Sequence, residues 1–296
     1  MVQRGVGDRT HDGRFVELAS RERAGVLRGE VDRIAERLRG LDASDLDRPA
    51  RGEWSVREVV AHLAAVPTFY RSSVERGRGG KHEGPAGGLA AGEGRGTIVA
   101  GGVQQQAAEV ARTAGDAVIE QFVAAGSALA DALDGDDDDL AYPCYHPGGI
   151  VPANRFAVLF GKELGLHEWD VFDALEPPGV MGRWGTDAAL AAMEEEIASG
   201  SLRWVTDSSA DPTTAVIEVS LRGHLQGRWH LLLESDTVLL VPPIPDRRVD
   251  GRFDADAGEF VLSCSGRLDP LTLLAENRAS GDAEPIRVLA RRLSGM

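Results

Sequence analysis

The sequence contains only two cysteines, Cys144 and Cys264, and they lie far apart. This spacing argues against both a disulfide framework and a cysteine-based zinc module. Basic residues are also few, because 32 Lys and Arg stand against 47 Asp and Glu, for a net charge of -15. That charge would repel a nucleic-acid backbone.

No apolar run reaches the roughly 18 residues of a membrane span, and the first residues lack the apolar core of a secretory signal. We expect a cytoplasmic protein that binds neither nucleic acid nor membrane.

The length and the apolar fraction predict two folded domains. A chain of 296 residues with 43% hydrophobic residues can form two separate cores. Helical periodicity dominates before Pro178, and strand-like alternation follows it. We therefore expect an α domain over residues 1–179 and an α+β domain over residues 180–296.

Four helices are predicted in the first domain from apolar residues that recur every three or four positions. The first carries the apolar stripe Leu27, Val31, Ile34, Leu38 and Leu41. The second begins at Ser55 with the capping box Ser-Val-Arg-Glu and runs toward Tyr70. The third and fourth span 103–133 and 153–175. Such helices bury their apolar stripes by packing into a four-helix bundle, whose interior can hold ligands.

Two polar segments of this domain are expected to be loops. Eleven of the 26 residues between Gly77 and Gly102 are glycine, and each loses much backbone entropy on ordering. The segment lacks the Walker pattern, so a mobile loop is favoured over a phosphate-binding cradle. The acidic run Asp136 to Asp139 lacks alternating ligand spacing, so a solvated loop is favoured over a calcium site.

The second domain is predicted to be a small antiparallel sheet with helices packed against it. A short helix is expected over 186–199. Strands are expected over 215–221 and at WHLLLE, TVLLV and FVLSCSG, with a Ser-Asp turn between the second and third of these segments. The segments LTLLAENR and PIRVLARRL are expected to form the last helices.

Three residues of the first domain form a candidate metal site. Glu163 and His167 are four positions apart on one predicted helix, so their side chains leave the same face. His62 lies on the inward face of the second helix, where a buried imidazole needs a partner. Two imidazoles and a carboxylate suit Zn²⁺ and leave a fourth position open, although iron, nickel and manganese also fit. Asp170 is a candidate acceptor for an imidazole N–H, or alternatively a surface charge.

Two motifs around these residues resemble a known family. The segments GEWSVREVVAHLA and FGKELGLHEWDVFDA look like the DinB-like bundle of mycothiol-dependent maleylpyruvate isomerases and related mycothiol S-transferases. The resemblance implies that His62, Glu163 and His167 bind the metal and that the second domain is of the sterol-carrier-protein type. It also implies an arginine from that domain that grips a substrate carboxylate near the metal, for which Arg278 is the candidate.

The sequence departs from the family pattern in two places. Glu168 replaces the usual small residue after the second histidine, and we expect it to add negative charge near the metal. The glycine-rich segment is a long insertion, for which disorder is favoured over a lid. The aromatic residues Trp204, Trp229 and Tyr145 could line a pocket, but aromatic residues in a bundle or sheet more often belong to the core, and none is assigned.

The leading hypothesis for function is a metal-dependent enzyme that activates a small thiol, mycothiol. The metal would lower the pKa of the thiol, and the thiolate would attack a small electrophile that bears a carboxylate. The outcome would be S-transfer or thiol-assisted cis-trans isomerisation. One alternative is a zinc hydrolase that uses water as its nucleophile. Another is a non-catalytic carrier of a small apolar ligand, which the apolar strands WHLLLE and TVLLV would suit.

Overall fold

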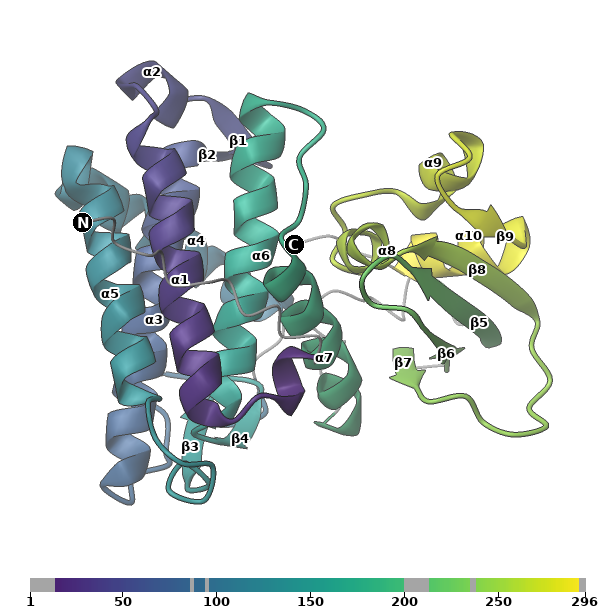
Figure 1. Cartoon of the computed structure of the whole chain (residues 1–296), viewed down its shortest axis with the longest axis horizontal. Helices are drawn as coiled ribbons and strands as arrows, with labels where there is room; N and C mark the ends of the chain where they lie inside the picture. Colours follow the sequence, from purple (N-terminus) through teal and green to yellow (C-terminus); the bar gives the residue numbers. More distant parts are fainter. Residues whose placement is uncertain (1–13, 86–87, 94–95, 200–212, 235–237, 293–296) are drawn as a thin grey trace, which may run out of the picture.

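The computed structural model describes residues 14–85, 88–93, 96–199, 213–234 and 238–292. Its elements form a helical part and a smaller part that contains a five-stranded sheet, and the two parts lie side by side (Figure 1). The chain thus combines helices and sheet as predicted. None of its described helices is long and apolar enough to cross a membrane.

Long helices pack along one another in the helical part (Figure 1). They are α1 (Ser20–Arg39), α3 (Val56–Arg78), α5 (Val118–Ala132) and α6 (Arg155–Leu175). Helix α3 contacts both α5 and α6, and α1 contacts the same two helices from the other side. The apolar stripe predicted for the first helix is buried between them, with Leu27, Val31 and Ile34 at 1% exposure or less.

The start of α3 follows the predicted capping box. The Ser55 side chain accepts a hydrogen bond from the backbone N–H of Glu58, and the Glu58 carboxylate accepts one from the backbone N–H of Ser55. This arrangement satisfies donors that a helix start leaves without partners. The helix continues past Tyr70 to Arg78, although Pro67 lies inside it. Its register places His62 on the side that faces α6.

The glycine-rich segment and the third helix differ from their predictions. Helix α4 (Gly96–Ala114) begins inside the expected loop, so only the middle of the segment lacks regular structure among its described residues. Ala107 and Ala111 are buried, and α4 packs against α3. Tertiary packing therefore offsets the cost of ordering the glycines. The expected single helix breaks at Gly115, whose φ of +54° belongs to the left-handed region, and the 3₁₀ turn η2 (Gly115–Ala117) leads into α5.

Short elements that the sequence did not suggest complete the helical part. They are η1 (Phe15–Glu17), α2 (Ala43–Leu46), the pair β1 (Pro49–Arg51) and β2 (Trp54–Ser55), and the pair β3 (Pro143–His146) and β4 (Gly149–Pro152). The first pair leads into α3 and the second leads into α6. Both therefore lie next to the helices that carry the candidate site.

The sheet has the strand order β7-β6-β5-β8-β9. Its strands are β5 (Ala215–Arg222), β6 (Gly227–Leu233), β7 (Val238–Val241), β8 (Gly251–Asp256) and β9 (Ser280–Gly281). The prediction of a wholly antiparallel sheet is wrong, because β8 pairs with β5 in parallel. The chain after β7 crosses two strands before it enters the sheet again, and a parallel pair requires such a crossover.

One predicted strand is a helix. The segment FVLSCSG lies largely in α8 (Ala257–Cys264), which Asp256 caps by accepting a hydrogen bond from the backbone N–H of Gly258. Its apolar residues are buried on all sides, and such a run has the same appearance in a buried strand and a buried helix. The helices α9 (Pro270–Ala275) and α10 (Ala283–Arg292) form where predicted. The expected Ser-Asp turn at 235–236 lies outside the described residues.

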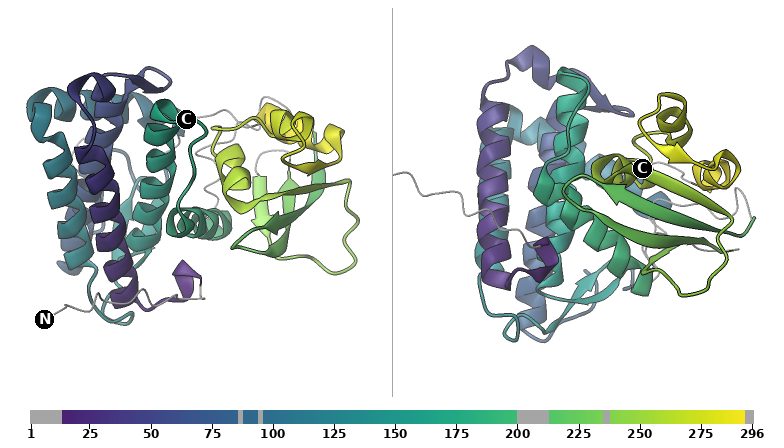
Figure 2. Two further views of the ribbon diagram at one scale, coloured as in Figure 1. Left: turned by 45° about the horizontal axis from the view of Figure 1, so that its top comes forward. Right: turned by 45° about the vertical axis from the view of Figure 1, so that its right-hand side comes forward.

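Helices α6 and α7 join the two cores. Helix α7 (Arg183–Ser199) runs between the helical part and the sheet (Figure 2). Phe160 and Ala188 belong to the core of the helical part, whereas Trp169 and Leu190 belong to the core around the sheet. The domain boundary at residue 179 stays a prediction, since α7 contributes to both cores.

Candidate metal centre

The three predicted ligands come together between α3 and α6. His62 projects from α3 and meets Glu163 and His167, which leave α6 one helical turn apart. The residues His62 and His167 are 7% and 8% exposed. The centroids of their rings are 4.6 Å apart, and the rings meet edge to face.

The distances within this triad suit a small cation. Glu163 Oε2 lies 3.4 Å from His62 Nε2 and 3.3 Å from His167 Nε2. Two ligands of a tetrahedral zinc ion, each about 2.0–2.1 Å from the metal, are roughly 3.3 Å apart. Candidate donor atoms of the three residues all lie within 4.8 Å of one another, and no other such group was found among the described residues. The residues present therefore fit a divalent cation.

The charge states of the triad are shifted in different directions. Burial lowers the pKa of His62 and thereby favours its neutral form, which has a lone pair for a metal. Burial alone would raise the pKa of Glu163, but Lys162 and the two imidazoles hold it well below the usual range. Burial likewise opposes the charge on His167, but hydrogen bonds with Asp170 and Glu163 outweigh burial and raise its pKa. The carboxylate is thus ionised at neutral pH and ready to bind a cation.

Asp170 orients the second imidazole. Its Oδ2 atom lies 2.8 Å from His167 Nδ1, and its side chain is fully buried. An ionised carboxylate can only accept, so it holds a proton on Nδ1, and Nε2 is the ring nitrogen that faces Glu163. Burial would raise the pKa of Asp170, but the neighbouring Arg267 and His167 lower it. Asp170 therefore has the position predicted for an outer partner of the site.

Three further residues at the site were not identified from the sequence. Arg267, from the turn between α8 and α9, donates two hydrogen bonds to Asp170. Trp54 lies over the triad, with its ring centroid 5.2 Å from that of His62 and nearly parallel to the ring of His167. Lys162 Nζ lies 3.5 Å from Glu163 Oε1. Trp54 and Lys162 lie within the two quoted motifs, so their nearness in sequence to His62 and Glu163 could have identified them. No sequence pattern around Arg267 indicates a role at the site.

Among the described residues, no contact joins Arg278 to the triad. Its guanidinium donates hydrogen bonds to Glu259 and Glu276, and its side chain is 40% exposed. A catalytic role for Arg278 stays a prediction. The arginine of the sheet-containing part that does reach the site's outer partners is Arg267.

The extra charge expected from Glu168 does not face the triad. The Glu168 carboxylate points to α1, where its two oxygens lie 2.6 and 2.7 Å from nitrogens of Arg33 and one also accepts from Arg37. Neighbouring residues on a helix project about 100° apart, so Glu168 leaves a different face from His167. That expectation is therefore wrong.

The aromatic residues left unassigned have local partners. Trp229 donates its indole N–H to Glu194, and the Tyr145 hydroxyl donates to the Leu89 carbonyl. Trp204 lies outside the described residues.

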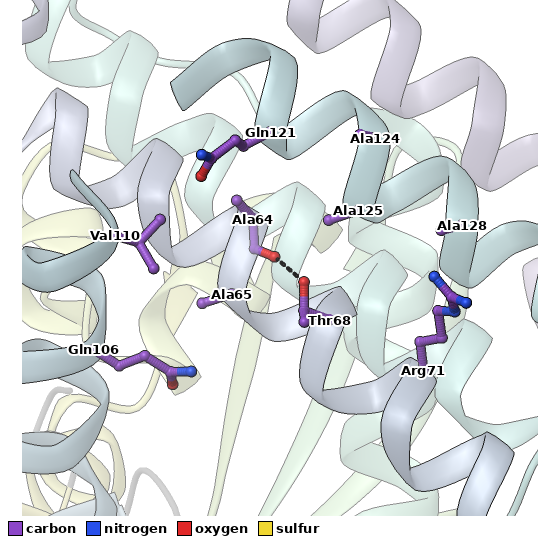
Figure 3. A pocket seen from close by; sticks show the side chains of 10 residues that line it. All are labelled: Ala64, Ala65, Thr68, Arg71, Gln106, Val110, Gln121, Ala124, Ala125 and Ala128. Atoms are coloured by element: carbon purple, nitrogen blue, oxygen red, sulfur yellow. Dashed lines mark hydrogen bonds between the residues drawn. The ribbon is translucent and has the colours of Figure 1, made fainter. Parts of the chain in front are cut away.

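A groove of about 420 Å³ lies apart from the triad, between α3, α4 and α5 (Figure 3). Small side chains form much of its lining, and Gln106, Gln121 and Arg71 project around it. The one hydrogen bond drawn there runs from the Thr68 hydroxyl to the Ala64 carbonyl of the same helix. None of the triad residues lines the groove.

Comparison with known proteins places this architecture. Residues 27–172 match the family described as the mycothiol maleylpyruvate isomerase N-terminal domain. The crystal structure of the mycothiol-dependent maleylpyruvate isomerase is similar over 92% of this chain and 96% of that chain, with a TM-score of 0.61 and 14% identity. A crystal structure of a mutant of that isomerase covers the same shares, with a TM-score of 0.60 and 13% identity. No curated protein sequence was found to match.

The match over 27–172 includes all three members of the triad. It agrees with the family resemblance that the two sequence motifs predicted. The matched part of the chain, 146 of its 296 residues, belongs to the mycothiol maleylpyruvate isomerase family. The two solved structures are too distant in sequence to show more than the shared fold.

Proposed function

We propose that His62, Glu163 and His167 bind a divalent cation, most simply Zn²⁺, and that the chain uses it to activate mycothiol. The observation that carries this proposal is the spacing of the three donor atoms, which matches adjacent ligands of one ion. The described residues provide three ligands and no fourth, and an open position is typical of catalytic rather than structural zinc. When bound, the cation would lower the pKa of a thiol at that position, so that thiolate exists near neutrality.

The surrounding residues would hold the three ligands in place and limit access of water. Asp170 holds the proton of His167 on Nδ1, so that Nε2 points to the ion. Trp54 covers both imidazoles with an apolar ring. Lys162 engages the second oxygen of Glu163, which favours a single carboxylate oxygen at the ion. These contacts support a preorganised site rather than a flexible one.

The proposed substrate is a small electrophile that bears a carboxylate. Positive charge near the triad supports this choice, because Lys162 lowers the pKa of Glu163 and Arg267 lowers the pKa of Asp170. The thiolate sulfur would bond to one carbon of an activated double bond, and the electron pair would move to the conjugated carbonyl. Rotation about the resulting single bond, return of the electron pair and loss of the thiolate would complete an isomerisation. Retention of the sulfur, with the proton released by the thiol added to the neighbouring carbon, would instead complete an S-transfer.

The experiment is to measure metal content, thiol binding and turnover on one preparation. We expect close to one zinc ion per chain, binding of mycothiol that requires the metal, and conversion of maleylpyruvate that requires both. A metal-free protein that is indifferent to mycothiol would sink the proposal. Hydrolysis of esters or amides without any thiol would instead indicate the hydrolase, and binding of apolar ligands with no turnover would indicate the carrier.

We further propose that the helical part is a DinB-like four-helix bundle and the sheet-containing part a domain of the sterol-carrier-protein type, divided near residue 179. The packing of α1, α3, α5 and α6 supports the first assignment. The strand order β7-β6-β5-β8-β9 with α8, α9 and α10 supports the second. Expression of residues 1–179 alone would test the division, and a folded helical fragment is the expected result.

A further inference from the structure

We propose that Arg267 is a positioning residue through which the sheet-containing part completes the outer shell of the metal centre. The proposal rests on metal binding by the triad, as set out above. Arg267 does not touch the triad in this structure; it grips Asp170, and Asp170 in turn holds His167. A change in the position of the sheet-containing part would thus reach the ligand through two hydrogen-bonded contacts.

The contact between Arg267 and Asp170 is a two-pronged fork. Nε of Arg267 lies 2.8 Å from Oδ1, and Nη2 lies 2.7 Å from Oδ2. The same Oδ2 lies 2.8 Å from His167 Nδ1. Because both oxygens are engaged, the carboxylate cannot rotate without breaking charge-assisted hydrogen bonds. The Arg267 side chain is 6% exposed and that of Asp170 is 0% exposed, so water cannot readily replace the fork.

The turn that carries Arg267 is itself held in place by both parts of the molecule. On its own side, the backbone N–H of Arg267 donates to the Leu262 carbonyl at the end of α8. Gly266 supports the turn with a φ of +67°. From the helical part, Arg51 of β1 donates to the Gly266 carbonyl at 3.1 Å. The guanidinium of Arg267 is therefore delivered to Asp170 from a turn with little freedom to move.

A simpler role for Arg267 would be to supply positive charge, and the two roles predict opposite results. A cation near the triad repels a divalent metal, so removal of the charge alone would tighten metal binding. Loss of a positioning contact would instead weaken it, because disruption of outer-shell partners typically lowers metal affinity about 10- to 100-fold. The direction of the change therefore separates positioning from charge.

The first experiment measures Zn²⁺ affinity of the full chain by competition with a chromophoric chelator. Arg267→Gln is expected to weaken Zn²⁺ binding at least about tenfold. Arg267→Lys retains the positive charge next to the buried Asp170 but cannot form the two-pronged contact. This variant is therefore also expected to weaken Zn²⁺ binding. Tighter binding by Arg267→Gln with unchanged binding by Arg267→Lys would overturn the proposal.

The second experiment tests whether Arg267 acts through Asp170. Asp170→Asn removes the carboxylate that joins Arg267 to His167. In that background, Arg267→Gln is expected to change Zn²⁺ affinity less than about twofold, because residues of one hydrogen-bond network do not have additive effects. Losses that multiply in the double variant would show that Arg267 acts independently and would overturn the proposal.

Arg33→Gln is the matched control. Arg33 makes a similar fork with Glu168, a buried acidic residue of α6 whose carboxylate points to α1 and away from the triad. We expect Arg33→Gln to lower the melting temperature but leave Zn²⁺ affinity unchanged. An equal loss of Zn²⁺ affinity in Arg33→Gln would show that the effect of the Arg267 variants comes from a general loss of packing. That result would overturn the proposal. Failure of the unaltered chain to bind Zn²⁺ would overturn the proposed function as well, whereas normal binding by every Arg267 variant would overturn this inference alone.

Discussion

Gly165 of α6 and Gly185 of α7 lie back to back, so close that a Cβ on Gly165 would stand 2.5 Å from the Cα of Gly185. Gly165 lies between Glu163 and His167 in the turn that carries two members of the triad. The close contact with α7 therefore uses the same turn of α6 as the triad but a different face of that helix. Only residues without a side chain allow this approach.

Gly165→Ala is expected to lower the free energy of unfolding by roughly 1–3 kcal/mol, because the added methyl group would force the two helix backbones apart. Denaturant titration measures the change. Gly25→Ala is the control, since nothing lies within 4 Å of a Cβ at that position of α1. There, alanine should stabilise the helix by about 0.5–1 kcal/mol. Unchanged stability in Gly165→Ala would mean that α7 can move away freely.

His62→Ala is expected to lower Zn²⁺ affinity by at least about a hundredfold, because loss of a direct ligand costs more than loss of an outer partner. Removal of metal by a chelator should lower the melting temperature of the unaltered chain, because a bound ion stabilises the folded state. It should not change that of the variant, which would hold no ion for the chelator to remove. His224→Ala, at an exposed position, is the control. Retained zinc in His62→Ala would exclude His62 as a ligand.

His146 is expected to make the fold sensitive to acid. Burial and the positive charges of Lys162 and Arg155 lower the pKa of His146 to about 3 from 6.5. Its Nδ1 accepts a hydrogen bond from the backbone N–H of Gly148, which suits the neutral ring. Because the unfolded state takes up this proton first, the stability is present above pH 6.5 and is lost as the pH falls toward about 3.

The substitution His146→Asn tests this pH dependence, because the amide oxygen can accept the same N–H while the titrating group is removed. The free energy of unfolding of the unaltered chain should fall more steeply between pH 6.5 and 4 than that of the variant, by at most about 1.4 kcal/mol per pH unit. Denaturant titrations at several pH values provide the comparison. Equal slopes would show that His146 can be protonated in the folded chain.

The two cysteines are expected to be inert in the folded protein. Burial raises the pKa of Cys144 to about 11 and that of Cys264 to about 12. At pH 8, alkylation by iodoacetamide should be on the order of a hundredfold slower than in the unfolded chain, because the thiolate is the reactive form. Mass spectrometry after timed labelling measures this. Slow labelling would assign any thiol requirement to the added thiol, whereas rapid labelling would make the cysteines candidate participants.

The sequence by itself determined the features that depend on residues a few positions apart. The capping box at Ser55 and Glu58 and the apolar stripe of α1 both formed as predicted. The pair Glu163 and His167 shares one face of a helix because residues four positions apart always do. The motif with His62 indicated that a second helix would face this pair, and it does.

Sequence patterns failed where the choice of partner depended on the whole fold. The segment FVLSCSG has no periodicity that separates a strand from a helix. It is helical in the structure, where Asp256 caps the start of α8. The parallel pairing of β5 with β8 required a crossover that no local pattern encodes. Glu168 appeared to be close to the metal in sequence, but its side chain faces the arginines of α1.

The outer shell of the site shows this division most clearly. Asp170 could be proposed from its spacing to His167, whereas Arg267 follows Asp170 by 97 positions and belongs to the other part of the molecule. A buried carboxylate must find a cationic partner, so the presence of a partner is predictable from physical chemistry. Which arginine fills that role depends on how α8, α9 and α6 pack. The three residues of the candidate site could thus be named from the sequence, whereas the arginine that contacts Asp170 was decided only by the tertiary structure.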